Sequence, residues 1–574
     1  MARFMRSACM VAVSLGVLSS EAVTTGAPSV YVVNSINDWA VQINAEVQST
    51  LPQITLKWAP SSKPKSYEIS RREKGDTGWT PLAKLPGNDN EYVDKTVKVG
   101  TIYEYLITCD GERYRGRGYI HSAIEAPLVE DRGVLLLVVD NTYAPQLVSE
   151  LDRLKGDLIG DGWTVLRHDV ATTDKPETVK SHIQGYYKAE PDLKAVFLFG
   201  HVPVPYSGKH SWDGHVDEHS GAWPADIYYA DMKGTWTDTT VNELSPVRVE
   251  NKNIPGDGKF DQDNAPGTAD LAIGRVDFAN MPVFVVRNEK ELLKQYLNKD
   301  HQYRHKMWNV VDRAVIDDNL GTKRYPAIGA WRSFAPCVGI GAVEVNDLLS
   351  QVRGQSHLLA YGCGGGSYAS AEGVGTSMDF AAAPSKAVFT MFYGSFFGDW
   401  DHSCSLLRAP LAAEGHGLSC SWSGEAPSWL YHPMGLGETL GYCTRLTQNA
   451  DDVEYPTRLP RKPGIIHAAL MGDPTLRFRI VAPATDLTIA KRPDYELRWT
   501  ASKETVIGYH VYRAGKISEK FTRITMTPVV GTTYTDPGSS GLTYVYQVRA
   551  VKLESTPSGI YFNSSQGIFK EVAP

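Results

Sequence analysis

One loop of the chain gathers side chains that carry out proton and metal chemistry. Within the 19 residues from 201 to 219 stand four imidazoles and several carboxylates, among them His201, His210, His215, His219 and Asp213. If this stretch were helical, His215 and His219 would share one face, because residues i and i+4 are neighbours on a helix. Two imidazoles placed in this way are ligands for a transition metal. Gly214 and the surrounding polar residues favour a hydrogen-bonded surface loop instead, and both interpretations stay open.

A second loop, at 255–267 (PGDGKFDQDNAPG), offers carboxylates alone. It sets Asp257, Asp261 and Asp263 in a turn-rich stretch. Alternating carboxylates supply the hard oxygen ligands that Ca²⁺ prefers. The spacing is not that of an EF-hand, and the closing glutamate of that motif is absent. Calcium is therefore the cofactor that this loop suggests, and a solvated acidic loop without an ion is the alternative.

Six cysteines follow the N-terminal segment, and none forms a C-x-x-C pair, which argues against a zinc ribbon or a redox motif. They are Cys109, Cys337, Cys363, Cys404, Cys420 and Cys443. In an oxidising compartment we expect one or two disulfides, drawn from the five cysteines between 337 and 443. Their connectivity is not determined by the sequence.

The elements that must position these loops belong to an α/β domain between about 130 and 482. Near-continuous apolar runs, typical of parallel strands buried on both faces, occur at 133–140, 194–200, 313–317, 357–361 and 387–393. Helical spacing appears at 144–158, 175–188 and 287–305. This alternation predicts a mostly parallel sheet with helices on both faces. Ligands bind at the carboxyl ends of such strands, so the loops that begin at Gly200, Gly362 and Gly394 are the ones to inspect.

Two flanking segments repeat each other. ITLKW and YEISR near the N-terminus correspond to YELRW and YHVYR near the C-terminus, and in each segment 25 positions separate the next pair of tyrosines, Tyr67 to Tyr92 and Tyr509 to Tyr534. The alternation of apolar and polar residues predicts half-buried strands of a sandwich. Both segments resemble fibronectin type III modules in the tryptophan of the second strand, the Tyr-x-Val/Ile-x-Arg strand and the late Tyr-x-Tyr strand. Such modules imply spacers or adhesive surfaces, and the fold does not decide between them.

The middle domain carries four motifs in a fixed order. They are LAIGRV (271–276), HLLAYGCGGG (357–366), FTMFYGSFFGDW (389–400) and MGDPTLR (471–477). In this order they resemble the gingipain-like cysteine peptidases over about 195–480. The resemblance implies a caspase-type fold and a cysteine endopeptidase. It also favours calcium, because those enzymes bind calcium in their catalytic domains.

The two residues on which that chemistry depends are replaced. In the family, a histidine in a Gly-His-Gly turn acts as the base, and a cysteine shortly before Gly-Asp is the nucleophile. Aligning Tyr361 with the family tyrosine puts Gly364 at the histidine position. Aligning Gly398 and Asp399 with the family Gly-Asp puts Ser395 at the cysteine position. The leading interpretation is therefore a degenerate pseudo-peptidase retained for binding or scaffolding.

Two alternatives keep an active enzyme. In the first, an imidazole from another loop activates Ser395. The candidates are His201, which directly follows a strand, and His402, seven residues after Ser395. In the second, the alignment is out of register and Cys363 or Cys404 is the reactive group.

The N-terminus predicts that the protein is exported. Arg3 and Arg6 precede an apolar stretch of about a dozen residues and then small residues, which is the layout of a signal peptide too short to span a bilayer. No later segment is long enough to be a transmembrane helix.

Hydrophobic residues make up 42% of the chain, and 58 basic against 65 acidic residues give a net charge of −7. This composition is globular and shows no footprint of a nucleic-acid partner.

The sequence therefore predicts a multidomain, exported protein. We expect a signal peptide at 1–27, a fibronectin type III-like sandwich at 28–125, a gingipain/caspase-like α/β domain at 130–482 and a second sandwich at 484–574. The expected partners are extracellular proteins or peptides. The natural ligand, the oligomeric state and any attachment to the cell surface are not determined by the sequence.

Overall fold

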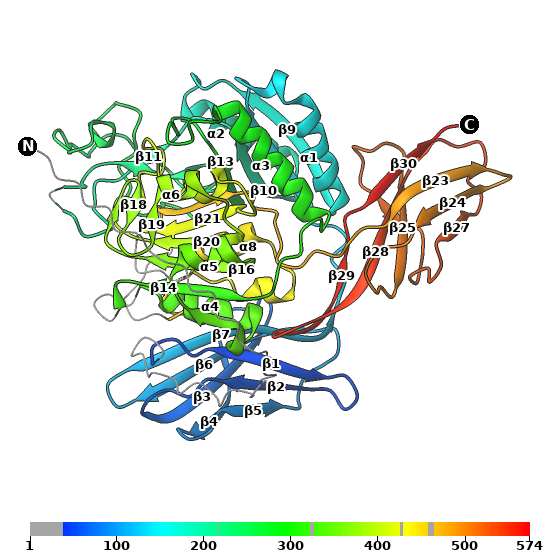
Figure 1. Cartoon of the computed structure of the whole chain (residues 1–574), viewed down its shortest axis with the longest axis horizontal. Coiled ribbons are helices and arrows are strands. Elements are labelled where there is room, and N and C mark those ends of the chain that lie inside the picture. Colours follow the sequence, from blue (N-terminus) through cyan, green and yellow to red (C-terminus); the bar gives the residue numbers. More distant parts are fainter. Residues whose placement is uncertain (1–37, 217, 322–325, 425–428, 457–463) are drawn as a thin grey trace, which may run out of the picture.

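The computed structural model describes residues 38–216, 218–321, 326–424, 429–456 and 464–574. They form a β-sandwich at the N-terminal end, an α/β domain and a second β-sandwich at the C-terminal end (Figure 1). The predicted signal peptide, 1–27, lies outside the described residues. Among the described residues, no helix has the length and apolar character needed to cross a membrane.

The α/β domain is built on a ten-stranded sheet in the order β15-β14-β16-β20-β21-β22-β13-β10-β8-β9. Its strands are β8 (Gly133–Asp140), β9 (Trp163–Val170), β10 (Leu193–Phe199), β13 (Ala272–Val276), β14 (Ala314–Asp318), β15 (Val343–Val345), β16 (His357–Cys363), β20 (Ala387–Tyr393), β21 (Ser419–Ser423) and β22 (Ala468–Gly472). Every neighbouring pair is parallel except β21 and β22. The prediction of a mostly parallel sheet is confirmed.

Helices cover both faces of this sheet. They are α1 (Val148–Gly160), α2 (Pro176–Ala189), α3 (Glu289–Arg304), α4 (Ile328–Val338), α5 (Leu348–Gly354), α6 (Ser377–Ala382), α7 (Ala409–Ala412) and α8 (Leu440–Asn449), with 3-10 turns η1 (Ala144–Gln146), η2 (Asp226–Tyr229), η3 (Val249–Asn251), η5 (Ile340–Ala342) and η6 (His432–Leu436). Alternate residues of β8 join different hydrophobic cores, Leu135 and Leu137 with α1 and α3, and Leu136 with α2. Because successive side chains of a strand point to opposite faces, the continuous apolar runs reflect burial on both sides.

Each flanking segment folds as two packed antiparallel sheets. The N-terminal sandwich pairs β1 (Ile43–Gln48), β2 (Gln53–Trp58) and β5 (Glu91–Asp94), and packs them on β3 (Pro64–Glu73), β4 (Thr80–Pro86), β6 (Ile102–Gly111) and β7 (Arg115–Ala126). The C-terminal sandwich pairs β23 (Thr485–Lys491), β24 (Tyr495–Thr500) and β27 (Thr533–Asp536), and packs them on β25 (Gly508–Ala514), β26 (Thr522–Arg523), β28 (Tyr544–Thr556) and β30 (Ile568–Val572). The all-β class of both segments is confirmed, and their assignment as fibronectin type III modules stays a prediction.

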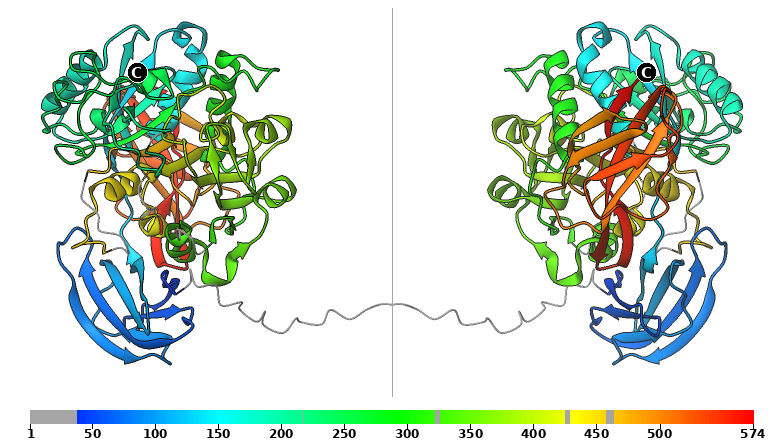
Figure 2. Two further views of the ribbon diagram at one scale, coloured as in Figure 1. Left: turned by 90° about the vertical axis from the view of Figure 1, so that its left-hand side faces the viewer. Right: turned by 90° about the vertical axis from the view of Figure 1, so that its right-hand side faces the viewer.

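The two sandwiches share one sheet although they lie at opposite ends of the chain. The hairpin of β28 and β29 (Gly559–Ser564) extends toward the N-terminal sandwich, where Gly559 pairs in parallel with Ala123 of β7. This pairing makes a continuous nine-stranded sheet. Figures 1 and 2 show the two sandwiches around the α/β domain, with the C-terminal one in front in the right panel of Figure 2. The position of each sandwich is therefore tied to that of the other.

The disulfides expected from the sequence are not formed in the described residues. All six cysteines from Cys109 onward are free thiols. They lie on separate elements and have other partners: the Cys363 thiol donates to Asp318 Oδ1 at 3.0 Å, and the Cys337 thiol donates to the carbonyl of Tyr431 at 3.5 Å. Five of the six are buried, so they pack as small apolar side chains.

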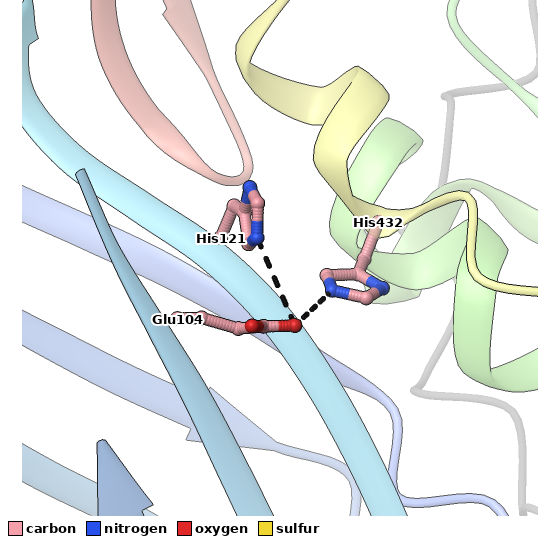
Figure 3. Close-up of side chains that lie close together, drawn as sticks. All are labelled: Glu104, His121 and His432. Atoms are coloured by element: carbon pink, nitrogen blue, oxygen red, sulfur yellow. Dashed lines mark hydrogen bonds and ion pairs between the residues drawn. The ribbon is translucent and has the colours of Figure 1, made fainter. Parts of the chain in front are cut away.

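A buried ionic cluster joins the N-terminal sandwich to the α/β domain. Glu104 of β6 accepts hydrogen bonds from His432 Nε2 of η6 at 2.7 Å and from the Tyr455 hydroxyl at 2.9 Å, while His121 of β7 lies 3.7 Å away (Figure 3). Arg72 Nε donates to the second oxygen of the same carboxylate at 2.7 Å. The Glu104 side chain is only 3% exposed, so its charge depends on these partners.

Replacing Glu104 by glutamine is expected to destabilise this junction by about 3–5 kcal/mol. It removes the carboxylate 2.7 Å from the buried Arg72 guanidinium and leaves it the more distant and partly exposed Glu454 carboxylate at 3.7 Å. Urea unfolding followed by tryptophan fluorescence measures the change. Glu68→Gln is the matched control, since Glu68 pairs with exposed Lys84 on the same sandwich and such surface pairs contribute little. Equal effects of the two variants would contradict the role given to Glu104.

Candidate active site

The two positions that the gingipain resemblance singles out lie side by side at the carboxyl ends of β16 and β20. These strands are parallel neighbours with Cys363 opposite Tyr393, and Gly364 and Ser395 follow their ends. The segments approach so closely that a Cβ on Gly366 would fall 2.3 Å from the Ser395 nitrogen. The sequence places each position after the end of a predicted strand, and the structure brings the two segments together. Their correspondence to a family dyad stays a prediction.

Gly364 has no room for a side chain. A Cβ at this position would lie 2.0 Å from the carbonyl oxygen of Glu372, which is far inside contact distance. The neighbour is backbone and does not swing away as a side-chain tip does. The backbone here is therefore shaped around glycine, and the position that the sequence resemblance aligns with the family histidine offers no side-chain base.

An imidazole reaches Ser395 from elsewhere. His215 Nε2 lies 2.8 Å from Ser395 Oγ, although 180 residues separate them in the sequence. The imidazole ring packs against Phe396 with centroids 5.0 Å apart. On its other side, Nδ1 lies 3.5 Å from Glu218 Oε2, a carboxylate that is 70% exposed. A hydroxyl, an imidazole on that hydroxyl and a carboxylate on the imidazole are the parts of an activated serine nucleophile.

His219 anchors the loop that carries His215. Its Nδ1 lies 2.6 Å from Asp213 Oδ2, and its Nε2 lies 2.9 Å from Asp399 Oδ2. Asp213 also accepts from the backbone N–H of Phe396 at 2.8 Å and from that of His215 at 3.3 Å. The His219 ring is fully buried. One imidazole between two carboxylates thus connects the His215 loop to the segment that carries Ser395.

Arg248 extends this network toward solvent. Its guanidinium lies 2.9 Å from Asp399 Oδ1 and holds both oxygens of Asp401, at 3.0 and 2.8 Å. Asn251 donates to Asp399 at 2.9 Å, and the Tyr206 hydroxyl donates to Asp401. The contacts from Arg248, Asn251 and Tyr206 thus hold the segment that follows Ser395 in place. Such positioning is what a reactive group requires for a defined geometry.

Phe396, the residue after the serine, adopts a strained backbone conformation. Its φ is +68°, a region that costs energy for a residue with a Cβ. The ring lies against both imidazoles, with centroids 5.0 Å from His215 and 4.5 Å from His219. Strain of this kind persists only where the surroundings impose it, and it clusters at functional sites. The sharp turn places the Ser395 hydroxyl beside the loop of His215.

The ionisation of the anchor follows from its partners. Burial disfavours charge on His219, but the hydrogen bonds and charges of Asp213 and Asp399 raise its pKa above the ordinary value. Burial by itself would raise the pKa of Asp213, but the hydrogen bond and charge of His219 lower it to about 2. The raised pKa of His219 and the lowered pKa of Asp213 both widen the pH range over which the two side chains are charged together.

We expect the folded protein to lose stability on both sides of this range. A raised His219 pKa contributes stability that is fully present below the unfolded value of about 6.5 and is lost as pH rises through the folded pKa. A lowered Asp213 pKa contributes stability present above about 3.8 and lost as pH falls toward about 2. Melting temperatures from pH 2 to 9, compared with those of His219→Gln, isolate the contribution. A variant that keeps the alkaline slope of the wild type would contradict it.

The two imidazoles expected beside Ser395 have other partners. His201 Nδ1 lies 2.8 Å from Asp277 Oδ2, at the ends of β10 and β13. His402 Nδ1 contacts the carbonyl of Ser403 at 2.9 Å, and its ring stacks on Tyr368 at 4.0 Å. The imidazole on Ser395 is His215 instead. From the sequence, His215 is a candidate metal ligand. The feature that could have indicated a base is its place in the loop that begins at Gly200.

The two cysteines of the alternative register have other partners in this structure. Cys363 is buried, and burial together with the neighbouring Asp318 carboxylate raises the pKa of its thiol. The reactive form of cysteine is the thiolate, which these surroundings disfavour. Cys404 Sγ accepts the backbone N–H of Val283 at 3.3 Å. Neither thiol is placed on an imidazole by the described contacts.

The residues expected to bind metals make other contacts in this structure. Both nitrogens of His219 face carboxylates, and His215 faces Ser395. Asp261 accepts the backbone N–H groups of Thr239, Thr240 and Val241, which lower its pKa against the effect of burial. Asp257 accepts from Ile254 and Lys259, and Asp263 accepts from Lys209 and His210. These aspartates order loop backbone, and calcium at this loop stays a prediction.

Comparisons with known proteins give structural neighbours but no family. No family model matches the sequence, and no curated protein matches it. Solved structures that are similar to the chain include two of RgpB. The complex of Porphyromonas gingivalis RgpB pro- and mature domains is 12% identical and covers 77% of this chain and 100% of that chain, with a TM-score of 0.45. The Arg-specific cysteine proteinase gingipain R (RgpB) is also 12% identical and covers 78% of this chain and 99% of that chain, with a TM-score of 0.44.

A third similarity concerns one flanking segment. An Fn3-like protein from Clostridium thermocellum is 23% identical over 13% of this chain and 76% of that chain, with a TM-score of 0.12. At these identities and TM-scores the neighbours assign no activity to the chain. The chemistry of the site is therefore argued from its own residues.

Proposed function

We propose that this protein is a hydrolase in which Ser395 is the nucleophile and His215 is its base. The observation that carries the proposal is the 2.8 Å distance between Ser395 Oγ and His215 Nε2. This distance is within the range in which an imidazole accepts a hydroxyl proton. The four motifs that resemble gingipain-like peptidases favour a peptide as the substrate. The predicted signal peptide favours a site of action outside the cytoplasm.

The proposed reaction is acyl transfer in two steps. Ser395 Oγ attacks the carbonyl carbon of the substrate while His215 Nε2 takes the hydroxyl proton. The bond from carbon to the leaving amine breaks, and the imidazolium returns the proton to that amine. Water then attacks the acyl-serine with His215 again as the base, which releases the acid and restores the hydroxyl. Glu218, 3.5 Å from Nδ1, is suited to orient the ring during both steps.

A mixed peptide library tests the proposal directly. The purified chain is incubated with the library, and the products are identified by mass spectrometry. We expect the wild type to cleave peptides and Ser395→Ala to cleave none. The wild type and Ser395→Ala must melt at the same temperature. Cleavage that survives in Ser395→Ala would overturn the role of the serine, and loss in Cys363→Ala alone would favour the thiol instead.

A second candidate is the pseudo-peptidase, a binding module without catalysis. The packing around Gly364 favours it, because this position excludes the family base. The two flanking sandwiches offer extended surfaces for protein or peptide ligands. The library experiment separates the candidates: retention of peptides without any cleavage would support the binding module and contradict the hydrolase.

Restoring the family histidine is not expected to restore a cysteine-peptidase site. Gly364→Ala should destabilise the domain by about 1–3 kcal/mol, the usual cost of overpacking, because its Cβ meets the Glu372 carbonyl. Gly364→His should cost more. Chemical denaturation measures both, with Gly341→Ala as the control because a Cβ at Gly341 meets nothing within 4 Å. Full stability of Gly364→Ala would show that the loop relaxes and that a side chain fits there.

A further inference from the structure

A cluster of metal-ligating side chains lies between α1 and α3, outside the site described above. The two helices lie side by side in Figure 1. Asp157 of α1 faces His301 at the end of α3 and His305, the residue directly after that helix. His301 Nδ1 lies 2.7 Å from Asp157 Oδ2, and His305 Nε2 lies 2.7 Å from Asp157 Oδ1.

Helix geometry brings the two imidazoles together. His301 and His305 are four residues apart, so they project from the same face of the helix, and their ring centroids are 4.2 Å apart. The three possible ligand atoms all lie within 4.8 Å of one another. A divalent ion with bonds of about 2.0–2.1 Å to nitrogen and oxygen fits among atoms at this spacing after small side-chain movements.

The surroundings of the cluster suit a cation. Farther along the same seam, Lys294 pairs with Glu150 and Arg153 donates to Asn298, so these positive groups already have partners. Asp300, beside His301, has a buried oxygen without a hydrogen-bond partner. The second oxygen of Asp300 accepts a hydrogen bond from Arg304 Nε at 2.9 Å.

Solvent access distinguishes this cluster from the one at the N-terminal junction. The side chains of His301 and His305 are 23% and 19% exposed, which leaves room for an ion to enter and for water to complete its coordination. The cluster of Glu104, His121 and His432 in Figure 3 likewise consists of one carboxylate and two imidazoles. They are fully buried, and the Arg72 guanidinium 2.7 Å from Glu104 already supplies the cation.

We propose that Asp157, His301 and His305 form a site for a divalent transition metal of the zinc type. Two imidazoles and one carboxylate are ligands that Zn²⁺ uses in proteins, with water in the remaining position. Each imidazole would bind the ion as the neutral ring, through the nitrogen that now faces Asp157 and with its proton on the other ring nitrogen. It would cross-link α1 to the end of α3. This site is independent of the proposed hydrolase.

Zinc titration of the full chain, first stripped with a chelator and exchanged into chelator-free buffer, tests the site. Calorimetry is expected to show one tight Zn²⁺ per chain, and Zn²⁺ is expected to raise the melting temperature. His301→Gln and His305→Gln should weaken binding by more than the roughly 10–100-fold that loss of an outer partner costs. Glutamine can still donate to Asp157, so these variants are expected to fold, and circular dichroism checks this.

Two control variants make the outcome specific. His182→Gln removes an imidazole from another close histidine pair, in which the rings of His168 and His182 are 4.3 Å apart, and should leave zinc binding unchanged. His215→Ala should also leave it unchanged. No tight uptake by the wild type would overturn the proposal and leave a hydrogen-bonded helix clamp. Uptake that the His301 and His305 variants retain, or that His215→Ala removes, would place the ion elsewhere.

Discussion

A fluorophosphonate probe is expected to label Ser395, and Ser395→Ala is expected to take no label at this site. The probe reacts with serines whose hydroxyl proton is removed as the oxygen attacks, and Ser395 Oγ lies 2.8 Å from His215 Nε2. The oxygen forms a bond to phosphorus as fluoride leaves, and the imidazole takes the proton. Intact mass and peptide mapping of the labelled protein identify the modified residue.

The imidazole should set the rate of this labelling. His215→Ala is expected to slow it by about 10²–10⁴-fold, the usual contribution of a general base. Ser367→Ala is the control, because Ser367 is exposed and its hydroxyl faces the hydroxyl of Ser370 at 2.7 Å and not an imidazole. A wild-type protein that takes no label at Ser395, or a His215→Ala protein labelled at the wild-type rate, would contradict the activated serine.

His219→Ala is expected to produce the largest loss of stability at the site. His219 is fully buried between Asp213 and Asp399, so its removal leaves two buried carboxylates with one less positive charge. Breaking a buried pair of this kind costs about 3–5 kcal/mol. Urea unfolding measures the change. The labelling rate should also fall, because Asp213 accepts the backbone N–H groups of His215 and Phe396.

A second histidine of the same region is the matched control for this variant. His402 is only half-buried, and its ring stacks on Tyr368. Its Nδ1 contacts a backbone carbonyl and not a carboxylate, so His402→Ala should cost clearly less than His219→Ala. Equal costs for the two variants would mean that the two carboxylates tolerate the loss of the imidazole, and the anchoring role of His219 would be wrong.

The two candidate functions differ in one physical respect. A pseudo-enzyme that lost its base need not keep an imidazole on the position of the nucleophile. Packing leaves no room for a side chain at Gly364, the position that the sequence resemblance aligns with the family histidine. A long loop nevertheless carries His215 to the serine, and an ionic network of His219, Asp213 and Asp399 secures it. Burying charged side chains costs free energy, so their presence around this one serine favours the hydrolase.

Local pattern was enough to predict the sheet and the edge at which the site lies. The runs at 133–140 and 387–393 coincide with β8 and β20, because strands buried on both faces require apolar residues at every position. The same reasoning places Gly364 and Ser395 at neighbouring strand ends. It also predicts α3, whose apolar residues recur at helical spacing.

Contacts between distant segments could not be predicted in this way. His215 and Ser395 are 180 residues apart. A loop that folds back onto a strand end shows no regular spacing of apolar residues from which its path could be predicted. The imidazole pair of His301 and His305 is visible from its spacing of four, whereas Asp157 comes from another helix. The cysteines likewise remain thiols because the fold puts them on separate elements. The residue types and the strand ends follow from local pattern, and the pairing of a serine with its imidazole is decided only by tertiary packing.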